Sequence, residues 1–444
     1  MKRSLLVFGL LALSAFAEVS LQLTDDLKLR LSGDVRARYE GFDWSVINPD
    51  VPRNGAHTNE YFRVRTRLGA ALDLGEDFTI NLRLANRFHY VTTSPAPDNN
   101  NGSSTWEFPD EVYLDDANVV FKNLLDGCLT LTVGRQSLML GNGLLVSEGT
   151  PFDQGRSVYF DGVTARFKDD TETVTAFVFY DNWKDRYVFI NDKNRSLRSG
   201  DTFTAGLYWT HAFCENLNLD TYYMFNDVDD RHPLFAERGY VADSSASVHT
   251  AGMRLFGSVP EWFRYSVEAA NQFGRDADGA HLGGTMADAR LDLLMAEQAI
   301  LKPILGFELT HFSGDDTDGH RNRRWNPVLT QCPLWGEELL PIMLNGMWSN
   351  LNFASTRLAC SPTEKSFLTL YLMDFYADER SGNVGDNACT GEGHHVGLLI
   401  GANAGYNFSK NLSCMAWISH FMPGDFYQNG HDCNWFRLEM TLAF

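Results

Sequence analysis

The stretch LKLRLSGDVRARYEGF at residues 27–42 alternates polar and apolar side chains with a period of two. Between residues 28 and 40 the even positions are polar, and the odd positions are apolar or small. This is the period of a β-strand with two chemically different faces. A second stretch, YFRVRTRLGAAL at 61–72, repeats it. Such strands fit a soluble sandwich, whose apolar face forms the core, or a membrane barrel, whose apolar face meets lipid while its polar face lines the lumen.

Residues 1–17, MKRSLLVFGLLALSAFA, have the parts of a secretory signal peptide. A basic start at Lys2 and Arg3 precedes an apolar run and the ending Ala-Phe-Ala, which fits an A-x-A cleavage site. A membrane anchor helix needs roughly 20 apolar residues, and this run is shorter. We therefore expect a signal peptide at 1–17, followed by one uninterrupted domain at 18–444.

The rest of the chain shows no apolar run long enough for a spanning helix, and its mean hydropathy is -0.25. It contains many short alternating segments and 13% aromatic residues. Low hydropathy with period two is typical of a membrane barrel, because only half of its strand residues face lipid. Counting the segments predicts about 18 strands, with the ambiguous segment at 284–300 taken as a strand. The predicted fold class is all-β, a transmembrane antiparallel β-barrel of the bacterial outer-membrane type.

The connectors between these segments fall into two classes, which orient the barrel. Short ones are expected as periplasmic turns, at 73–77, 123–127, 168–172, 214–216 and 408–411. Long polar ones are expected as external loops, at 91–110, 313–349 and 377–394.

The last segment, CNWFRLEMTLAF, is an alternating strand that ends the chain on an aromatic residue. Its apolar face includes Met440, Leu442 and Phe444. Such an ending resembles the closing strand of bacterial outer-membrane proteins, which the barrel assembly machinery recognises. We therefore predict that these three residues form the assembly signal.

Motifs that carry catalysis are absent from the sequence, which has no GxSxG elbow, HExxH, P-loop or dinucleotide fingerprint. We predict that the protein is not an enzyme and has no cofactor and no metal. Seven cysteines occur without CxxC spacing, so at least one stays unpaired within the chain. Cys332 with Cys360, and Cys389 with Cys433, are the loop-side pairs to test as disulfides.

Arginines concentrate on one face of the first three strands. Each lies an even number of positions from its neighbours in the strand: Arg36, Arg38, Arg63, Arg65, Arg67, Arg83 and Arg87, with Arg30 before them. An arginine that faces lipid near the midplane costs roughly 2 to 4 kcal/mol, so in a barrel this face must be the lumen. Guanidinium groups bind carboxylates in a bidentate manner, so the set favours anionic solutes.

The same arginines also have a purely structural interpretation. Carboxylates on neighbouring strands can pair with them, namely Asp34, Glu40, Glu111, Asp115, Asp116, Glu268 and Glu308. The formal charge of -20 becomes -22 once Lys2 and Arg3 leave with the signal peptide, which argues against long-range attraction of anions. A local cationic constriction remains compatible with it, because charges are screened beyond roughly 10 Å.

The run at 129–167 resembles a pattern of the alginate export family of outer-membrane proteins. The matching residues of its GRQ segment and of the FDGV segment that follows a loop are Gly134, Arg135, Gln136, Arg156, Phe160, Asp161 and Val163. LGFELTHFSGDD with RRWNPVL, the opening strands and the closing hairpin also resemble that family. The resemblance implies a barrel of about 18 strands whose positive lumen passes an anionic polysaccharide such as alginate. It adds Arg135, Arg156 and Arg166 to the expected pore-lining residues.

The function predicted from the sequence is therefore an outer-membrane channel that passes anionic solutes. Its expected partners are outer-membrane lipid, the barrel assembly machinery and an anionic small molecule or polysaccharide, and no nucleic acid. Three alternatives remain: a general diffusion porin, a barrel enzyme, and a structural or adhesive barrel with a plugged lumen. Single-channel recording distinguishes among them.

Overall fold

The fold is described from a computed structural model of the whole chain. The described residues are 19–43, 58–93, 105–106, 108, 110–147, 156, 159–191, 197–198, 200–229, 246–275, 279–295, 301–316, 321–327, 329–330, 348–381, 384 and 389–444. The predicted signal peptide at 1–17 and Cys332 lie outside them. In the part of the chain so described, no helix has the length and apolar character needed to cross a membrane.

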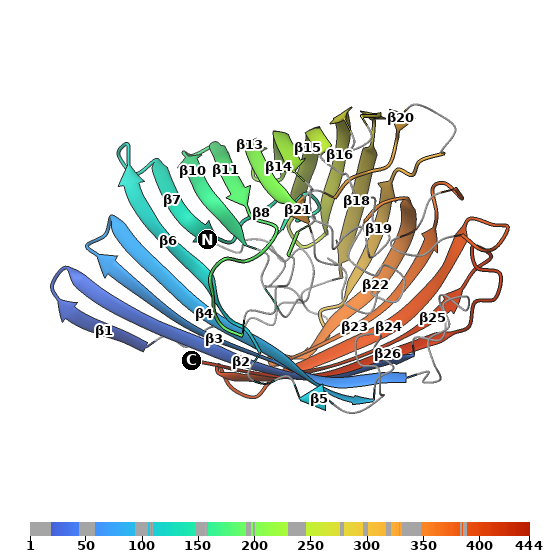
Figure 1. Cartoon of the computed structure of the whole chain (residues 1–444), viewed down its shortest axis with the longest axis horizontal. Coiled ribbons are helices and arrows are strands. Elements are labelled where there is room, and N and C mark those ends of the chain that lie inside the picture. The colour runs from blue at the N-terminus through green and yellow to red at the C-terminus, as the bar shows by residue number, and fades with distance from the viewer. Residues whose placement is uncertain are drawn as a thin grey trace.

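Eighteen antiparallel strands form a closed barrel, as Figure 1 shows from one end. They are β2(Leu27–Asp43), β3(Thr58–Leu74), β4(Phe78–Thr93), β6(Val112–Leu124), β7(Leu129–Gln136), β10(Phe160–Lys168), β11(Glu172–Asp181), β13(Asp201–Cys214), β14(Leu217–Asp229), β15(Ala246–Val259), β16(Phe263–Arg275), β18(Thr285–Leu294), β19(Ile304–Phe312), β22(Leu351–Thr363), β23(Ser366–Tyr376), β24(His395–Asn407), β25(Leu412–Pro423) and β26(Cys433–Ala443). Each pairs with the next, and β26 pairs with β2 to close the ring. The predicted fold class and strand number are confirmed, and the ambiguous segment at 284–300 begins with strand β18.

Alternation along each strand separates the two faces of the wall. In β26, Leu438 is 56% exposed and its neighbour Arg437 is 1% exposed. In β19, Leu309 is 63% exposed and Glu308 is 6% exposed. Apolar side chains thus point outward and polar ones inward, the arrangement of a barrel in lipid.

Eight short strands supplement the ring: β1(Val19–Thr24), β5(Thr105–Trp106), β8(Met139–Leu140), β9(Val146–Ser147), β12(Val188–Ile190), β17(His281–Leu282), β20(Arg321–Asn322) and β21(Leu329–Thr330). The first of them, β1, pairs with residues 27–31 at the start of β2. The closing strand β26 pairs with the residues of β2 that follow, 34–42. The strand β12 pairs with residues 112 and 113 at the start of β6. The long strand β7 pairs only with later residues of β6, from 117 onward.

The end of the chain is fixed to the first barrel strand. The Phe444 N–H donates to the Gly33 carbonyl at 2.9 Å, and the Gly33 N–H donates to the Phe444 carbonyl at 2.8 Å. The Phe444 ring lies over Gly33, where an added Cβ would be 2.5 Å from the ring. Glycine is therefore the residue that permits this contact.

Both suggested disulfide pairs need correction. Cys389 and Cys433 are free thiols. Cys360 lies at the end of β22 that leads into the short turn before β23, not on the side of the long loops. The sequence offered no spatial constraint on these pairings, because linear spacing does not report which barrel end a cysteine occupies.

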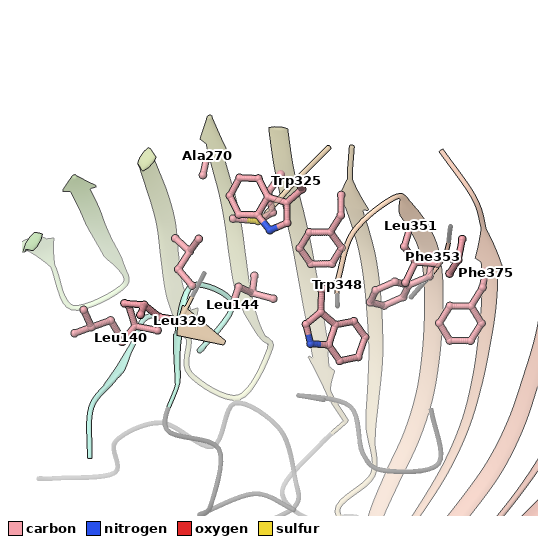
Figure 2. Close-up of a cluster of buried hydrophobic side chains, with 14 of the residues drawn as sticks. Leu140, Leu144, Ala270, Trp325, Leu329, Trp348, Leu351, Phe353 and Phe375 are labelled. Atoms are coloured by element: carbon pink, nitrogen blue, oxygen red, sulfur yellow. The ribbon is translucent and has the colours of Figure 1, made fainter. Parts of the chain in front are cut away.

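The segment after β7 turns into the barrel instead of continuing the wall. It carries β8 and β9, and β9 pairs with β21 from a distant loop, so that both segments lie within the ring in Figure 1. Leu140 and Leu144 are buried against Leu329, and Trp325 and Trp348 extend the same apolar cluster to the strands in Figure 2. The lumen is therefore partly filled by inward-folded chain.

Candidate pore-lining site

Arginines from four adjacent strands form one wall of the lumen, called here the arginine wall. Its members are Arg36, Arg38, Arg63, Arg65, Arg67, Arg87 and Arg437. Strand register arranges them in rows that run across β26, β2, β3 and β4. The alternation of each strand points them inward, as the sequence predicted.

One row of the wall consists of like charges directly opposite one another. Arg36 pairs in register with Arg65, and Arg65 pairs with Arg87. In the next row Arg38 lies opposite Arg63. Side chains directly opposite in an antiparallel pair have Cβ atoms about 4.5–5.5 Å apart, and like charges there are destabilising.

Carboxylates interleave with these rows. The Asp34 carboxylate accepts from Arg65 Nη2 at 3.0 Å and from Arg67 Nε at 2.6 Å. The Glu40 carboxylate accepts from Arg437 Nε at 2.5 Å and from Arg63 Nη2 at 2.9 Å. The remaining carboxylate of the rows, Glu439, accepts from Arg38 Nε.

On these four described strands, the rows hold more arginines than carboxylates. Their seven arginines face three carboxylates on the same four strands. Most of these side chains are buried, so their charges lie in a medium that screens them less than bulk water does. The ion pairs agree with the structural interpretation, and solute binding by this wall stays a prediction.

Arg83 and Arg166 lie apart from the wall. Arg83 is bound by Asp115 on β6, and its side chain is 28% exposed. Arg166 lies on β10 opposite the buried Thr175, on the inward face, and is itself exposed. Among the described residues, no carboxylate forms an ion pair with Arg166.

Arg135, which the sequence predicts to line the pore, binds several groups of the protein. Its guanidinium donates through Nε and Nη2 to Asp161, both at 2.8 Å, and through Nη1 to the Leu114 carbonyl at 2.8 Å and to Asp185 at 3.1 Å. The Tyr159 ring lies 3.3 Å from the guanidinium carbon. All three nitrogens are thus used at the point where β7 ends, so this side chain anchors loops to the wall.

Arg156, also predicted to line the pore, binds the same Asp185 carboxylate. It donates to Asp185 at 3.1 Å, lies 3.4 Å from Glu111 and stacks on Tyr113 at 3.9 Å. Burial alone would raise the pKa of Asp185, but the charge of Arg135 and hydrogen bonds from Tyr159 and the Tyr187 N–H hold it below its ordinary value. The Asp185 carboxylate therefore stays ionised between the two arginines.

The wall opposite the arginines has more carboxylates. Asp220, Glu268, Asp288 and Glu308 are buried on the inward faces of β14, β16, β18 and β19, which lie across the ring from β2 and β3 in Figure 1. Arg290 lies between Asp288 at 2.8 Å and Glu308 at 3.0 Å. The lumen is thus bounded by a cationic wall and a mixed, more acidic wall.

The segment that carries β8 and β9, at 139–147, is called here the inward segment, and it is attached to this second wall. Arg254 donates through Nε to Asp220 at 2.7 Å and through Nη1 to the Asn142 amide oxygen at 2.7 Å. The Asn142 amide nitrogen donates to the Ser266 hydroxyl at 3.1 Å. An apolar cluster holds one side of the segment, and this polar bridge holds its tip.

The sequence analysis missed three residues of the site: Arg254, Asn142 and Arg437. Arg437 carries the same period-two signal as the first strands, so a reading of the closing strand for polar positions would have found it. Asn142 lies in a loop without periodicity, and its partner Arg254 is 112 positions away. No local pattern indicates that contact.

The comparisons with known proteins agree with this geometry. The family model described as alginate export matches residues 28–438. The chain belongs to the alginate export family. No curated protein sequence matches the chain.

Solved structures with the same fold as this alginate export family member are outer-membrane porins at low sequence identity. OccAB1 of Acinetobacter baumannii is 12% identical with a TM-score of 0.60, over 94% of this chain and 96% of that one. OpdQ of Pseudomonas aeruginosa is 12% identical with a TM-score of 0.57, over 94% and 97%. OpdK of Pseudomonas aeruginosa, solved with vanillate, is 13% identical with a TM-score of 0.56, over 93% and 98%. At these identities the likeness shows the fold.

Proposed function

We propose that this protein is a passive channel of the bacterial outer membrane that passes carboxylated anions along the arginine wall. The observation that carries the proposal is the row of Arg36, Arg65 and Arg87, directly opposite one another on the inward face. On the four described strands of the wall, seven arginines face three carboxylates, which supports a local preference for anions despite the formal charge of -20 for the whole chain.

The physical reason lies in the cost of the like-charge row. Opposed guanidinium groups repel one another, and an anion between them relieves that repulsion. A carboxylate also accepts two parallel N–H bonds from a guanidinium, which gives geometric preference over chloride. A row of guanidinium groups on the inward face suits the transient binding of a permeating anion.

The inward segment favours small carboxylates as the first class of solute to test. It is bound to Arg254 of the mixed wall through Asn142 and occupies part of the ring. OpdK, a different porin, was solved with vanillate, which is a small carboxylate. An anionic polysaccharide such as alginate presents the same carboxylates in a repeating series, so its oligomers form the second arm of the test.

The experiment is planar-bilayer recording of the refolded full chain. A salt gradient gives the anion preference from the reversal potential, and addition of vanillate or of alginate oligomers reports binding through current block. We expect an anion preference at low salt and block by vanillate below the concentration at which acetate blocks. Equal permeability to cations and anions would identify a general diffusion porin, and absence of conductance a structural barrel.

A further inference from the structure

The outward face of the barrel carries an apolar groove beside the closing seam. Ala404 of β24 lies opposite Ala416 of β25, and Leu368 and Leu438 flank this pair in register. All four side chains point away from the lumen. Together with the outward residues of the next row they line a hollow of about 730 Å³. The two alanines therefore create a depression in an otherwise convex wall.

The groove extends toward the short turns at one end of the barrel. Its next row contains Met440, Cys414, Tyr406 and Ser366, which are neighbours in register. Met440 is 53% exposed, and Tyr406 is 40% exposed. The volume lies in the range of about 300 to 1,000 Å³ that is typical of sites for small molecules. Its lining is almost entirely apolar, so it suits a hydrocarbon chain.

Two lysines lie at the end of the groove. Lys365 is in the turn between β22 and β23, next to the groove residue Ser366, and Lys410 is in the turn between β24 and β25. The Asn407 N–H donates to the Lys365 carbonyl at 2.8 Å, so the two turns are in contact. Both lysines are exposed, and within the described part of the chain neither forms an ion pair. Glu364 is the one acidic side chain of these two turns, so their side chains carry two positive charges and one negative charge.

We propose that this groove binds one phospholipid with an anionic head group. An acyl chain fills the hollow over Ala404 and Ala416, and the phosphate lies at Lys365 and Lys410. A polar head beside a cationic turn and a tail along an apolar wall match the two parts of the site. A second copy of the chain fits less well, because a two-fold axis along the membrane normal at the groove would bring like-charged turns together.

The first test is native mass spectrometry of the delipidated full chain with phosphatidylglycerol or phosphatidylcholine of identical acyl chains. At low salt each lysine adds roughly fivefold in affinity for an anionic surface, so we expect a roughly 25-fold preference for phosphatidylglycerol from the two lysines. The double variant Lys365→Gln/Lys410→Gln removes that preference. The matched control, Lys168→Gln/Lys302→Gln, neutralises two exposed lysines elsewhere, one at the end of β10 and one just before β19, and retains the preference.

The second test fills the groove. Ala416→Trp abolishes the tightly bound phosphatidylglycerol, whereas Ala269→Trp, at an exposed outward position on β16, leaves it bound. A heat-dependent shift in gel mobility verifies that each variant is folded. If Ala416→Trp does not fold, the lysine variants still test the proposal. Equal binding of the two lipids, or unchanged binding in Ala416→Trp, overturns the proposal. A dimer that is lost in Ala416→Trp overturns it in favour of a second copy.

Discussion

Replacing Arg36 and Arg65 together by glutamine separates solute binding from structural pairing. Both residues belong to the like-charge row. Asp34 keeps a partner in this variant, because Arg67 Nε lies 2.6 Å from its carboxylate. Glutamine remains polar and compatible with the lumen. The change thus removes two of the seven wall arginines without leaving the nearest carboxylate unpaired.

The expected magnitude follows from the geometry. A unit charge about 4 Å from a permeating carboxylate contributes about 1 kcal/mol at the dielectric constant of water. Two charges contribute about 2 kcal/mol, which corresponds to roughly 30-fold in anion occupancy when 1.4 kcal/mol is tenfold. We expect the anion-to-cation permeability ratio to fall by up to this factor at 0.01 M salt. The fall shrinks at 1 M, where the Debye length is roughly 3 Å.

The assay is the reversal potential across planar bilayers, with the thermal midpoint of unfolding measured on the same samples. The matched control is Arg264→Gln/Arg357→Gln, which removes two arginines that both contact Asp292 on the other side of the lumen. The control should change selectivity much less, because it leaves the like-charge row intact.

Structural pairing makes the opposite prediction for the double variant. If Arg36 and Arg65 mainly neutralise buried carboxylates, their loss should destabilise the barrel by about 3 to 5 kcal/mol, the usual cost of breaking a buried pair. A variant with reduced stability and unchanged selectivity at low salt would refute the reasoning. So would an equal loss of selectivity in the control, because the charge of the whole lumen rather than the row would then set the preference.

Deleting Phe444 should lower the amount of barrel inserted in the outer membrane while leaving the unfolding of inserted barrels unchanged, and normal outer-membrane levels would contradict the predicted assembly signal. Asn142→Ala removes the amide that bridges the inward segment to the opposite wall, so we expect larger or noisier single-channel conductance with an unchanged thermal midpoint. The pKa of Asp185 is held below its ordinary value of about 3.9, so its stabilising contribution is complete above that pH and is lost as pH falls through the lower folded-state value. Asp185→Asn should therefore lower the thermal midpoint at pH 7 and 5, and the difference from the unaltered protein should vanish only in strong acid. A tag in the turn at 168–172 should be hidden on intact cells and one in the loop at 377–394 accessible, and the reverse pattern would mean that the barrel is oriented the other way.

The amino-acid sequence by itself determined the number of barrel strands and the face that each residue occupies. Both follow from a local rule, because a strand places neighbouring side chains on opposite faces wherever it lies in the fold. The segment at 27–42 therefore predicted the inward position of Arg36 and Arg38 without any knowledge of its neighbours. The same local rule predicted β18 from an ambiguous segment.

Local pattern failed where strands are short or where the chain leaves the wall. The strands β1 and β12 have six and three residues, too few for a clear period. The inward segment has no periodicity at all, so nothing in the sequence indicated that Asn142 would meet the wall. Arg135 and Arg156 are predicted to line the pore, and only the tertiary structure shows that both contact Asp185.

The tertiary structure alone decided which charges meet. Arg38 and Glu439 are partners across the closing seam, although 401 positions separate them in the chain. Register between strands placed Arg36 opposite Arg65 and put Ala404 beside Ala416, which created the like-charge row and the outer groove. Alternation fixes the face of a residue but leaves its cross-strand neighbour open, because that neighbour depends on how two distant strands are aligned when the barrel closes.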